Sequence, residues 1–343
     1  MRHNAAAVLP EAGTSVIPVV DIADYIAGRP GALDAAGRRL HDALTTTGFF
    51  ILTGHGVPQP LVTRTFAEAR RFHELPMEKK LALKLNEHNN GYMVMGRYAV
   101  RTSTLNTNDR GDLNEAFFMK RERPADDPLL RSGRRFVGPN QWPVESDLPE
   151  FRANMLEYAR VMDRFVRHFM PIVAIALDLP PDWFDEAFTD SMHTLRLSHY
   201  PPVTPGPNEF GIAPHTDSNF MTFLAQTEIP GLQLRTPPEG PHGGEWIDVP
   251  YVPNSFAVNS GDTMHRWTNG RFLSTPHRAV PPRGRDRYAI PFFFGPRFDQ
   301  MIECLPTCTG PDNPPRWEPI TYADWQTWWY DHNYDPKDQR DVA

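Results

Sequence analysis

The sequence predicts an α+β, mainly β fold: a double-stranded β-helix, or jelly-roll, core flanked by helices and preceded by a helical N-terminal region. The first observation is a change of pattern after Leu195, where short apolar or alternating runs are broken by Pro, Gly and Asn. Short runs at this spacing are typical of a β-sandwich or barrel. They are TLRLSHYPP, NFMTFLAQ, GLQLRT, EWIDVPYV, SFAVNSGD, FLSTPHRAV and RYAIPFFFGP. The second observation is helical periodicity upstream, so helices come first and a jelly roll follows.

The upstream helices are predicted from apolar residues at helical spacing and from their end signals. The longest signal, LPEFRANMLEYARVMDRFVRHFMPIVAIALDLP, carries an apolar stripe that we interpret as core. Residues 32–48 and 58–76 are also predicted to be helical, the first ending at a glycine and the second at a proline. Short strands are expected within 15–26 and 49–57, and a terminal amphipathic helix within 321–335.

Three segments make up the expected organisation, and we expect them to form one integrated catalytic unit. Residues 1–150 form a helical and irregular N-terminal region with a substrate-covering loop. Within it, residues 91–140 are rich in Gly, Asn, Arg and Pro and are expected to be irregular. Residues 151–300 supply the long helix and the jelly roll, and residues 301–343 form a C-terminal tail and helix.

Composition narrows the class of protein. The 343 residues carry a net charge of −7, which argues against a nucleic-acid partner or an anionic membrane. No apolar run is long enough to span a membrane, and the N-terminus lacks a sustained apolar stretch. The two cysteines, Cys304 and Cys308, are expected to be free thiols. We therefore expect a cytoplasmic protein, a monomer or weak homo-oligomer, that acts on a small molecule.

Three residues have the types and spacing of a metal site. His215 and Asp217 are two residues apart, and in a strand such residues share a face. His277, in STPHRAV, opens a later run that we expect to neighbour the first. Two histidines and one carboxylate on one face leave coordination positions open, as non-haem Fe(II) oxygen chemistry requires. Zinc hydrolases also use this ligand set, so the ligands alone leave the metal open.

Arg287 narrows the chemistry. It sits ten residues after His277 in the apolar strand RYAIPFFF, and a buried guanidinium needs an anion. One reading is a structural salt bridge with Asp286 or another acid. The other is a bidentate partner for a ligand carboxylate. A metal triad with a buried arginine one strand away suits a metal-chelating 2-oxo diacid.

In these motifs the chain resembles the isopenicillin N synthase-like family of Fe(II)/2-oxoglutarate-dependent oxygenases. The matches keep the family's order over roughly residues 15–300. They are IPVVD (17–21), GFFILTGHGV (48–57), RRFHELPMEKK (70–80), GPNQWP (138–143), LRLSHYPP (195–202), HTDSNFMTFL (215–224), GLQL (231–234), VNSGDTMHRWTNGRFLSTPHRAV (258–280) and RYAIPFFF (287–294).

The resemblance implies roles for the site residues. It makes His215, Asp217 and His277 the iron ligands and Arg287 the partner of the 2-oxoglutarate distal carboxylate. The residues that it implies near the co-substrate or substrate are Tyr200, Ser198 and Phe293, and the arginines expected in the covering loop as candidate substrate contacts are Arg97 and Arg101. His199 neighbours Tyr200 and is expected to point away from the pocket.

Two positions depart from the family pattern. The family has Arg-x-Ser, whereas this chain has Arg287-Tyr288-Ala289, so a hydroxyl that usually shares the co-substrate carboxylate is missing. Asn114 stands before Glu115, where related sequences often carry Lys. The first change predicts weaker 2-oxoglutarate binding or another donor in its place.

The implied activity is oxidation of a small, apolar or aromatic metabolite, such as a secondary metabolite. Fe(II), 2-oxoglutarate and O₂ are the implied cofactors and co-substrates, with ascorbate as a stimulant, and succinate and CO₂ are released. Hydroxylation is the default outcome, with desaturation or cyclisation as variants. The alternatives are a 2-oxoglutarate-independent oxidase of the same fold, which Ala289 favours, a zinc hydrolase, which leaves Arg287 unexplained, and a non-catalytic ligand-binding relative.

Overall fold

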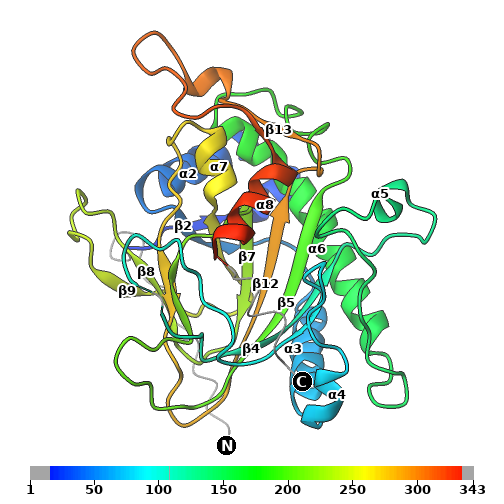
Figure 1. Cartoon of the computed structure of the whole chain (residues 1–343). Helices are drawn as coiled ribbons and strands as arrows, with labels where there is room; N and C mark the ends of the chain where they lie inside the picture. Colours follow the sequence, from blue (N-terminus) through cyan, green and yellow to red (C-terminus); the bar gives the residue numbers. More distant parts are fainter. Residues whose placement is uncertain (1–15, 108, 334–343) are drawn as a thin grey trace, which may run out of the picture.

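The computed structural model describes residues 16–107 and 109–333, and its centre is a large, mostly antiparallel sheet (Figure 1). Among the strand pairs of the described residues, β1–β2 alone is parallel. In spatial order the eight strands are β1 (Val19–Asp21), β2 (Phe49–Thr53), β10 (Phe256–Ser260), β7 (Met221–Gln226), β12 (Arg287–Gly295), β5 (Met192–Tyr200), β4 (Glu115–Lys120) and β3 (Gly91–Met93). Strands from the first 150 residues thus share one sheet with strands from the second half of the chain.

A second, smaller sheet completes the β structure around the centre of the molecule. Its four strands, in spatial order, are β6 (Ile212–His215), β11 (His277–Ala279), β8 (Leu232–Arg235) and β9 (Trp246–Asp248). A two-stranded ribbon of β13 (Met301–Ile302) and β14 (Ile320–Thr321) precedes the last helix.

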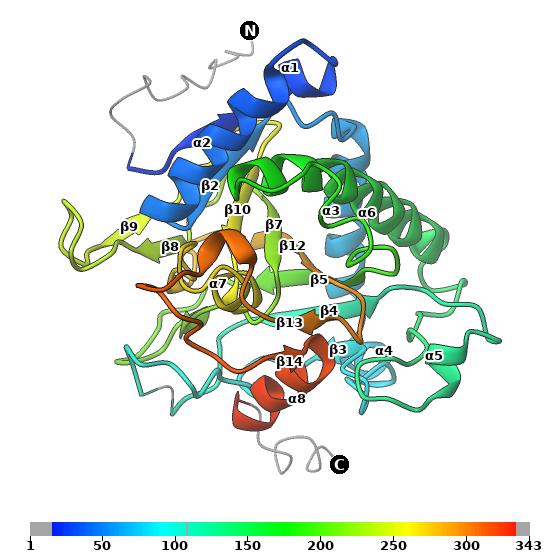
Figure 2. The same ribbon diagram turned by 90° about the horizontal axis from the view of Figure 1, so that it is seen from above.

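The helices divide between two sides of the large sheet. Seen from above, α2, α3 and α6 cover one face, while α8 lies on the opposite side (Figure 2). The helices are α1 (Ala23–Ile26), α2 (Ala32–Thr46), α3 (Gln59–His73), α4 (Met77–Leu81), α5 (Pro128–Arg131), α6 (Phe151–Ala176), α7 (Asp262–Trp267) and α8 (Tyr322–Asn333), with a 3₁₀ turn at Pro306–Cys308.

Side chains alternate between two environments along the central strands, as the two-residue period of a strand requires. Leu195 and Leu197 of β5 join the apolar core under α6, whereas Arg196 and Ser198 face cavities on the other side. On β7, Phe223 lies edge-on to phenylalanines of α6 at centroid distances of 5.8 Å. Each fully buried phenylalanine contributes roughly 1.5–3 kcal/mol of stability. The sheet thus has a core face and a cavity face.

The structure confirms the predicted α+β character, the long helix and the terminal helix, and its strands form a large, mostly antiparallel sheet and a smaller one. It corrects the expectation that residues 91–140 are wholly irregular, because this segment supplies β3, β4 and α5. The pattern EAFFMK of β4 was hidden among loop residues. Cys304 and Cys308 are free, as expected. Among the described residues, no helix has both the length and the apolarity needed to cross a lipid bilayer.

Candidate metal centre and adjoining cavities

Three predicted ligands meet between the two sheets. His215 ends β6, His277 begins β11, and the two are direct partners in that antiparallel pair. Asp217 follows β6, and its Oδ1 lies 3.8 Å from His215 Nε2 and 3.7 Å from His277 Nε2. These distances are too long for hydrogen bonds. The three atoms therefore face one common point where a metal ion fits.

Asp217 reaches this point by a different route from the expected one. The sequence pattern predicts that it shares a strand with His215, with both residues on one face. The structure ends β6 at His215 and puts Asp217 in the bend before β7. The bend is held because Asp262 N donates to the carbonyl of Asp217 at 2.7 Å. The prediction that His215 and Asp217 converge is right, but the turn, not strand alternation, brings them together.

Hydrogen bonds fix which atoms are offered to a metal. His215 Nδ1 lies 2.8 Å from the carbonyl of Ala213, and His277 Nδ1 lies 3.1 Å from that of Thr275. A carbonyl only accepts, so each Nδ1 carries the hydrogen and each Nε2 presents a lone pair. Asp217 Oδ2 accepts from Thr222 Oγ1 at 2.6 Å and Asn259 Nδ2 at 2.8 Å, which leaves Oδ1 for the metal.

The ionisation of the group suits cation binding. Burial, followed by the charge of His277, lowers the pKa of His215 to about 4, so its ring is neutral near pH 7. Burial alone would raise the pKa of Asp217, but the two imidazoles and the bonds from Asn259 and Thr222 hold it below its ordinary value. An anionic carboxylate beside two imidazoles that present Nε2 is a suitable donor set for Fe(II) or Zn(II).

Arg287 is buried, but it does not form the structural salt bridge that was one of the two interpretations of this residue. It is 1% exposed at the start of β12, and its guanidinium lies over the ring of Tyr200 at 4.8 Å. Asp286 instead lies 2.7 Å from His199. Within the described residues, Arg287 Nε and Nη1 have no hydrogen-bond partner, and burial lowers the pKa of the group. A buried cation with open donors indicates an anionic ligand.

Arg287 lines a cavity of about 570 Å³, open solvent at its mouth included, that also contains all three ligand side chains. We call it the Arg287 cavity. Tyr200 is the β5 partner of Arg287, and Ser198 is the β5 partner of Ala289. The Ser198 hydroxyl is buried, and none of the described residues bonds it. A hydroxyl thus stands on the neighbouring strand, directly across from the position where the family pattern has serine.

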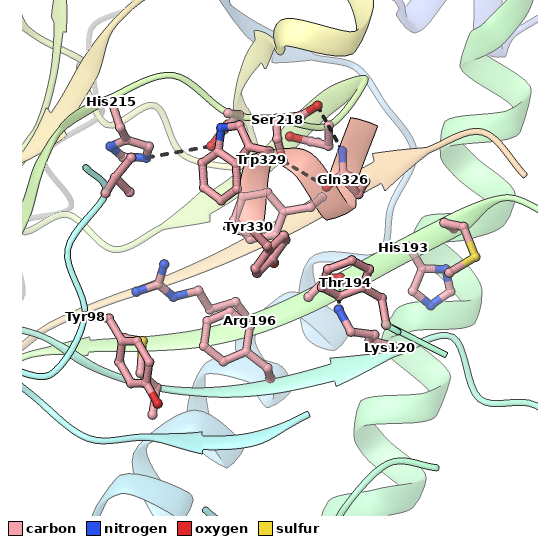
Figure 3. A pocket seen from close by; sticks show the side chains of 18 of the residues that line it. Tyr98, Lys120, His193, Thr194, Arg196, His215, Ser218, Gln326, Trp329 and Tyr330 are labelled. Carbon is pink, nitrogen blue, oxygen red and sulfur yellow. Dashed lines mark hydrogen bonds and ion pairs between the residues drawn. The ribbon is translucent and has the colours of Figure 1, made fainter. Parts of the chain in front are cut away.

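A second cavity, which we call the Lys120 cavity, adjoins the first at His215, Asp217 and Phe293. It takes in about 1000 Å³, including its open mouth. Figure 3 shows its lining of aromatic rings and two basic side chains, Lys120 and Arg196. Phe293 lines both cavities, in keeping with its predicted place near substrate.

Arg196 and Lys120 were missed by the sequence analysis. Arg196 was visible as a charged residue within the alternating run TLRLSHY, a pattern that already singled out Arg287. Lys120 had no such signal, because its strand was taken for loop. The covering loop reaches this cavity through Tyr98 and Val100. Arg97 and Arg101 are exposed and border a separate surface hollow, so their contact with substrate stays a prediction.

A second group of two histidines and a carboxylate lies elsewhere, where α3 meets β4 and β5. It contains His73, Glu115 and His199, and their ligand atoms are as close together as those of the first group. Here Glu115 also binds Lys80 Nζ at 2.9 Å and accepts from the hydroxyl of Tyr92. His199 lies outside both cavities, as predicted.

Comparison with known families identifies two matching regions. Residues 17–145 match the family described as the N-terminal region of the non-haem dioxygenase in morphine synthesis. Residues 191–296 match the 2OG-Fe(II) oxygenase superfamily. The second region contains all three candidate ligands and Arg287.

Individual relatives match over most of their length. The chain is 34% identical to hxnY of Emericella nidulans, a 2-oxoglutarate-Fe(II) type oxidoreductase, over 92% of this chain and 90% of that protein. It is 36% identical to the 2-oxoglutarate-dependent dioxygenase citB of Monascus ruber, over 84% and 87%. Among solved structures, a full-length Neurospora crassa protein in complex with alpha-KG superposes with a TM-score of 0.78 and 27% identity, over 91% and 95% of the two chains. The same Neurospora crassa protein has also been solved with alpha-KG and thymine.

Proposed function

Because the chain belongs to the 2OG-Fe(II) oxygenase superfamily, we propose that His215, Asp217 and His277 hold its Fe(II). Arg287 receives the distal carboxylate of 2-oxoglutarate. The protein is an Fe(II)/2-oxoglutarate-dependent oxygenase, and these four residues are its machinery for the metal and the co-substrate. Membership of the family removes the need for the zinc-hydrolase reading, which left Arg287 without a role.

The observation that carries this assignment is the state of Arg287. A guanidinium that is 1% exposed, with two of its nitrogens unpartnered among the described residues, costs stability unless a ligand supplies an anion. The cavity that holds it also holds the triad. A dicarboxylate with one end at the metal and the other at Arg287 satisfies both sets of donors.

The chain's own residues prepare the site. Hydrogen bonds to the carbonyls of Ala213 and Thr275 keep both Nε2 lone pairs free, and Thr222 and Asn259 hold the second oxygen of Asp217. Bound Fe(II) supplies the O₂ chemistry that couples oxidation of 2-oxoglutarate to succinate and CO₂ with oxidation of the substrate. The apolar walls from Phe49, Leu224 and Phe293 exclude water from that chemistry.

Tyr200 and Ser198 complete the co-substrate site. Tyr200 fixes one face of the Arg287 guanidinium, so the fork approaches a carboxylate in one orientation. Ser198 Oγ is buried and lies opposite Ala289, so it replaces the hydroxyl that the family pattern has at that position. This replacement answers the argument from Ala289 for an oxidase that does not use 2-oxoglutarate.

The substrate enters the Lys120 cavity, which is lined by aromatic and apolar side chains and reaches the metal ligands. This lining supports a small metabolite with an apolar or aromatic body, with Phe293 as one contact. The Neurospora crassa structure with thymine is an example of a small planar molecule held in a related fold. Hydroxylation is the expected outcome.

The wider architecture follows from the same arrangement. The two sheets form a double-stranded β-helix with the iron between them. Residues 1–150, 151–300 and 301–343 act as one unit, because β4 belongs to the large sheet and α8 lines the Lys120 cavity. Residues of the loop near Tyr98 cover the substrate.

The test is Arg287→Lys, with Arg285→Lys as a matched control. Lysine keeps the charge but loses the two-pronged donor geometry, so 2-oxoglutarate affinity is expected to fall by more than about tenfold. Arg285 is two residues away, and its side chain is 69% exposed, so its variant should bind as the parent does. Anaerobic titration of the Fe(II)–2-oxoglutarate charge-transfer band measures the affinity, and succinate release with Fe(II) and ascorbate measures turnover. Unchanged affinity in Arg287→Lys contradicts the assignment.

A further inference from the structure

Two cations line the Lys120 cavity from neighbouring strands. Lys120 is the β4 partner of Thr194, and Arg196 lies two residues further along β5. Arg196 is therefore a diagonal neighbour of Lys120, and the two side chains leave the sheet about 7–8 Å apart, within reach of one small group. Figure 3 shows both side chains on the wall of the same cavity, with the guanidinium of Arg196 extending toward the side on which His215 lies.

Neither cation forms an ion pair through its existing contacts. Lys120 is 5% exposed, and its ammonium donates to Thr194 Oγ1 at 3.2 Å and lies 5.5 Å from the Phe136 ring centre. An ammonium has three donors, so this bonding uses only part of its capacity. Burial lowers the pKa of Lys120 to about 8, which keeps it charged near pH 7.

Arg196 is in a similar state. Its guanidinium lies 5.1 Å from the Phe118 ring centre, and its Nε is buried with no hydrogen-bond partner in the described part of the chain. Neither Arg196 nor Lys120 forms an ion pair with any residue in 16–107 or 109–333. The acids that line the cavity are Asp112 and Asp217, of which Asp217 is the proposed iron ligand.

The remaining walls define the body of the ligand. They are aromatic or apolar: Met93, Tyr98, Phe118, Phe136, Phe293 and Tyr330. A ligand with a flat apolar body and one negatively charged group would pack its body against these rings and place its charge beside the cations. Two cations facing two acids suit a single negative charge better than a phosphate dianion.

We propose that the substrate carries a carboxylate, which Arg196 and Lys120 bind together in the Lys120 cavity. This inference rests on the proposed function and narrows its substrate class to small aromatic or alicyclic carboxylic acids. Recognition of the carboxylate fixes which carbon of the ring faces the metal. Arg196 and Lys120 thereby determine specificity and the position of oxidation.

The experiment compares acids with their uncharged amides. The probes are benzoate and benzamide, cinnamate and cinnamamide, and naphthalene-2-carboxylate and its carboxamide. Binding to the holoenzyme with Fe(II) and saturating 2-oxoglutarate is measured anaerobically by calorimetry. In at least one pair the acid should bind about tenfold or more tightly than the amide, as a charge-assisted contact predicts.

The variants are Arg196→Gln and Lys120→Met, with Arg160→Gln as a control on the exposed side of α6. The first two should bring the acid to within about threefold of the amide, whereas the control keeps the parent's preference. Neither variant should unfold much more readily in urea than the parent, because neither removes a member of an ion pair in the described chain. Lower stability in both variants would indicate structural cations and would overturn the proposal.

Other outcomes separate this proposal from the assignment of the 2-oxoglutarate site. Arg287→Lys should weaken 2-oxoglutarate and keep the preference for acids. Arg196→Gln and Lys120→Met should keep the parent's affinity for 2-oxoglutarate and lose the preference for acids. Acids and amides that bind equally, or panel members that do not bind at all, overturn the carboxylate proposal. So does loss of 2-oxoglutarate binding in Arg196→Gln with the acid preference retained. If acids bind more tightly than amides but no succinate is released, the carboxylate site is supported and the proposed oxygenase function is contradicted.

Discussion

The described residues contain two groups of two histidines and one carboxylate, and the groups differ in which of their atoms carry hydrogen bonds. One is His215, Asp217 and His277, between the two sheets. The other, His73, Glu115 and His199, lies where α3 meets the large sheet. In each group the ligand atoms lie within 4.8 Å of one another, so heavy-atom positions do not separate them.

In the first group the chain's own hydrogen bonds avoid the atoms that face the common point. Both Nδ1 atoms donate to carbonyls, and only Oδ2 of Asp217 is bonded. Two lone pairs and one anionic oxygen are left facing each other. That arrangement is unfavourable by itself and is relieved by a cation.

In the second group most of these positions are already satisfied; His73 Nδ1, 3.4 Å from Glu115, is the one left without a hydrogen bond among the described residues. Lys80 and Tyr92 donate to one oxygen of Glu115, and His199 lies 2.8 Å from the other. The second nitrogen of His199 lies 2.7 Å from Asp286. Both ring nitrogens of His199 face carboxylates, so both donate, and the charges of Lys80 and His199 balance those of the two acids. This group stabilises the fold and does not need a metal.

The largest expected effect is loss of iron and turnover in the first group. His215→Ala, Asp217→Ala and His277→Ala should each abolish turnover while keeping the parent's circular dichroism, because two ligands hold iron poorly. His199→Gln is the matched control from the second group and should still bind one iron. Iron titration of each variant checks this. Activity in any triad variant contradicts the assignment of that ligand, and loss of iron in His199→Gln would make the two groups equivalent.

The next effect concerns folding stability, and here a substitution in the second group should cost more than one in the first. Glu115→Gln leaves Lys80, which is 5% exposed, without its carboxylate. Removing one partner of a buried ion pair costs roughly 3–5 kcal/mol. Asp217→Asn in the metal-free protein removes a charge that has no cation beside it and should cost less than about 1 kcal/mol.

Urea unfolding of the metal-free proteins measures both changes. A double variant, Lys80→Met with Glu115→Gln, should recover part of the loss because it removes both charges. Equal losses in Glu115→Gln and Asp217→Asn would contradict the distinction between a satisfied and an unsatisfied group.

A smaller effect is the pH dependence of the second group. Burial opposes protonation of His199, but Glu115 and Asp286 raise its pKa above the ordinary value. Its contribution is therefore complete below about pH 6.5, the unfolded value, and is lost as pH rises through the raised folded value. The stability difference between the parent and His199→Gln should shrink between about pH 6 and 9. A difference that grows with pH would mean that His199 is neutral.

Sequence reasoning could find the first group because its members carry local signals. His215 and Asp217 are two residues apart, and His277 and Arg287 interrupt apolar strands. The second group had no such signal, since α3, β4 and β5 bring its members together only in the folded chain. Lys120 was missed for the same reason, because its strand lies in a segment that reads as loop. Strand pairing, not spacing, decides these neighbours.

Ser198 and Ala289 allow the comparison of satisfied and unsatisfied polar groups to be made for a single hydroxyl. Like the first group, the Ser198 hydroxyl is buried and unbonded by the described residues, which indicates a ligand contact. Ser198→Ala should weaken 2-oxoglutarate binding by about 5- to 30-fold, the effect of one charge-assisted hydrogen bond of about 1–2 kcal/mol. Its urea unfolding should not change.

The two positions are direct partners on β5 and β12, so a hydroxyl moved from one to the other shifts by about one strand spacing and stays on the same face of the sheet. Ala289→Ser alone should change affinity little, because Ser198 already supplies the bond and Ala289 is only 2% exposed. In the Ser198→Ala background, however, Ala289→Ser should restore most of the loss. Anaerobic titration of the four proteins gives the coupling directly. If the two substitutions act independently, the hydroxyls do not share a ligand, and Ser198 has been wrongly assigned to the co-substrate.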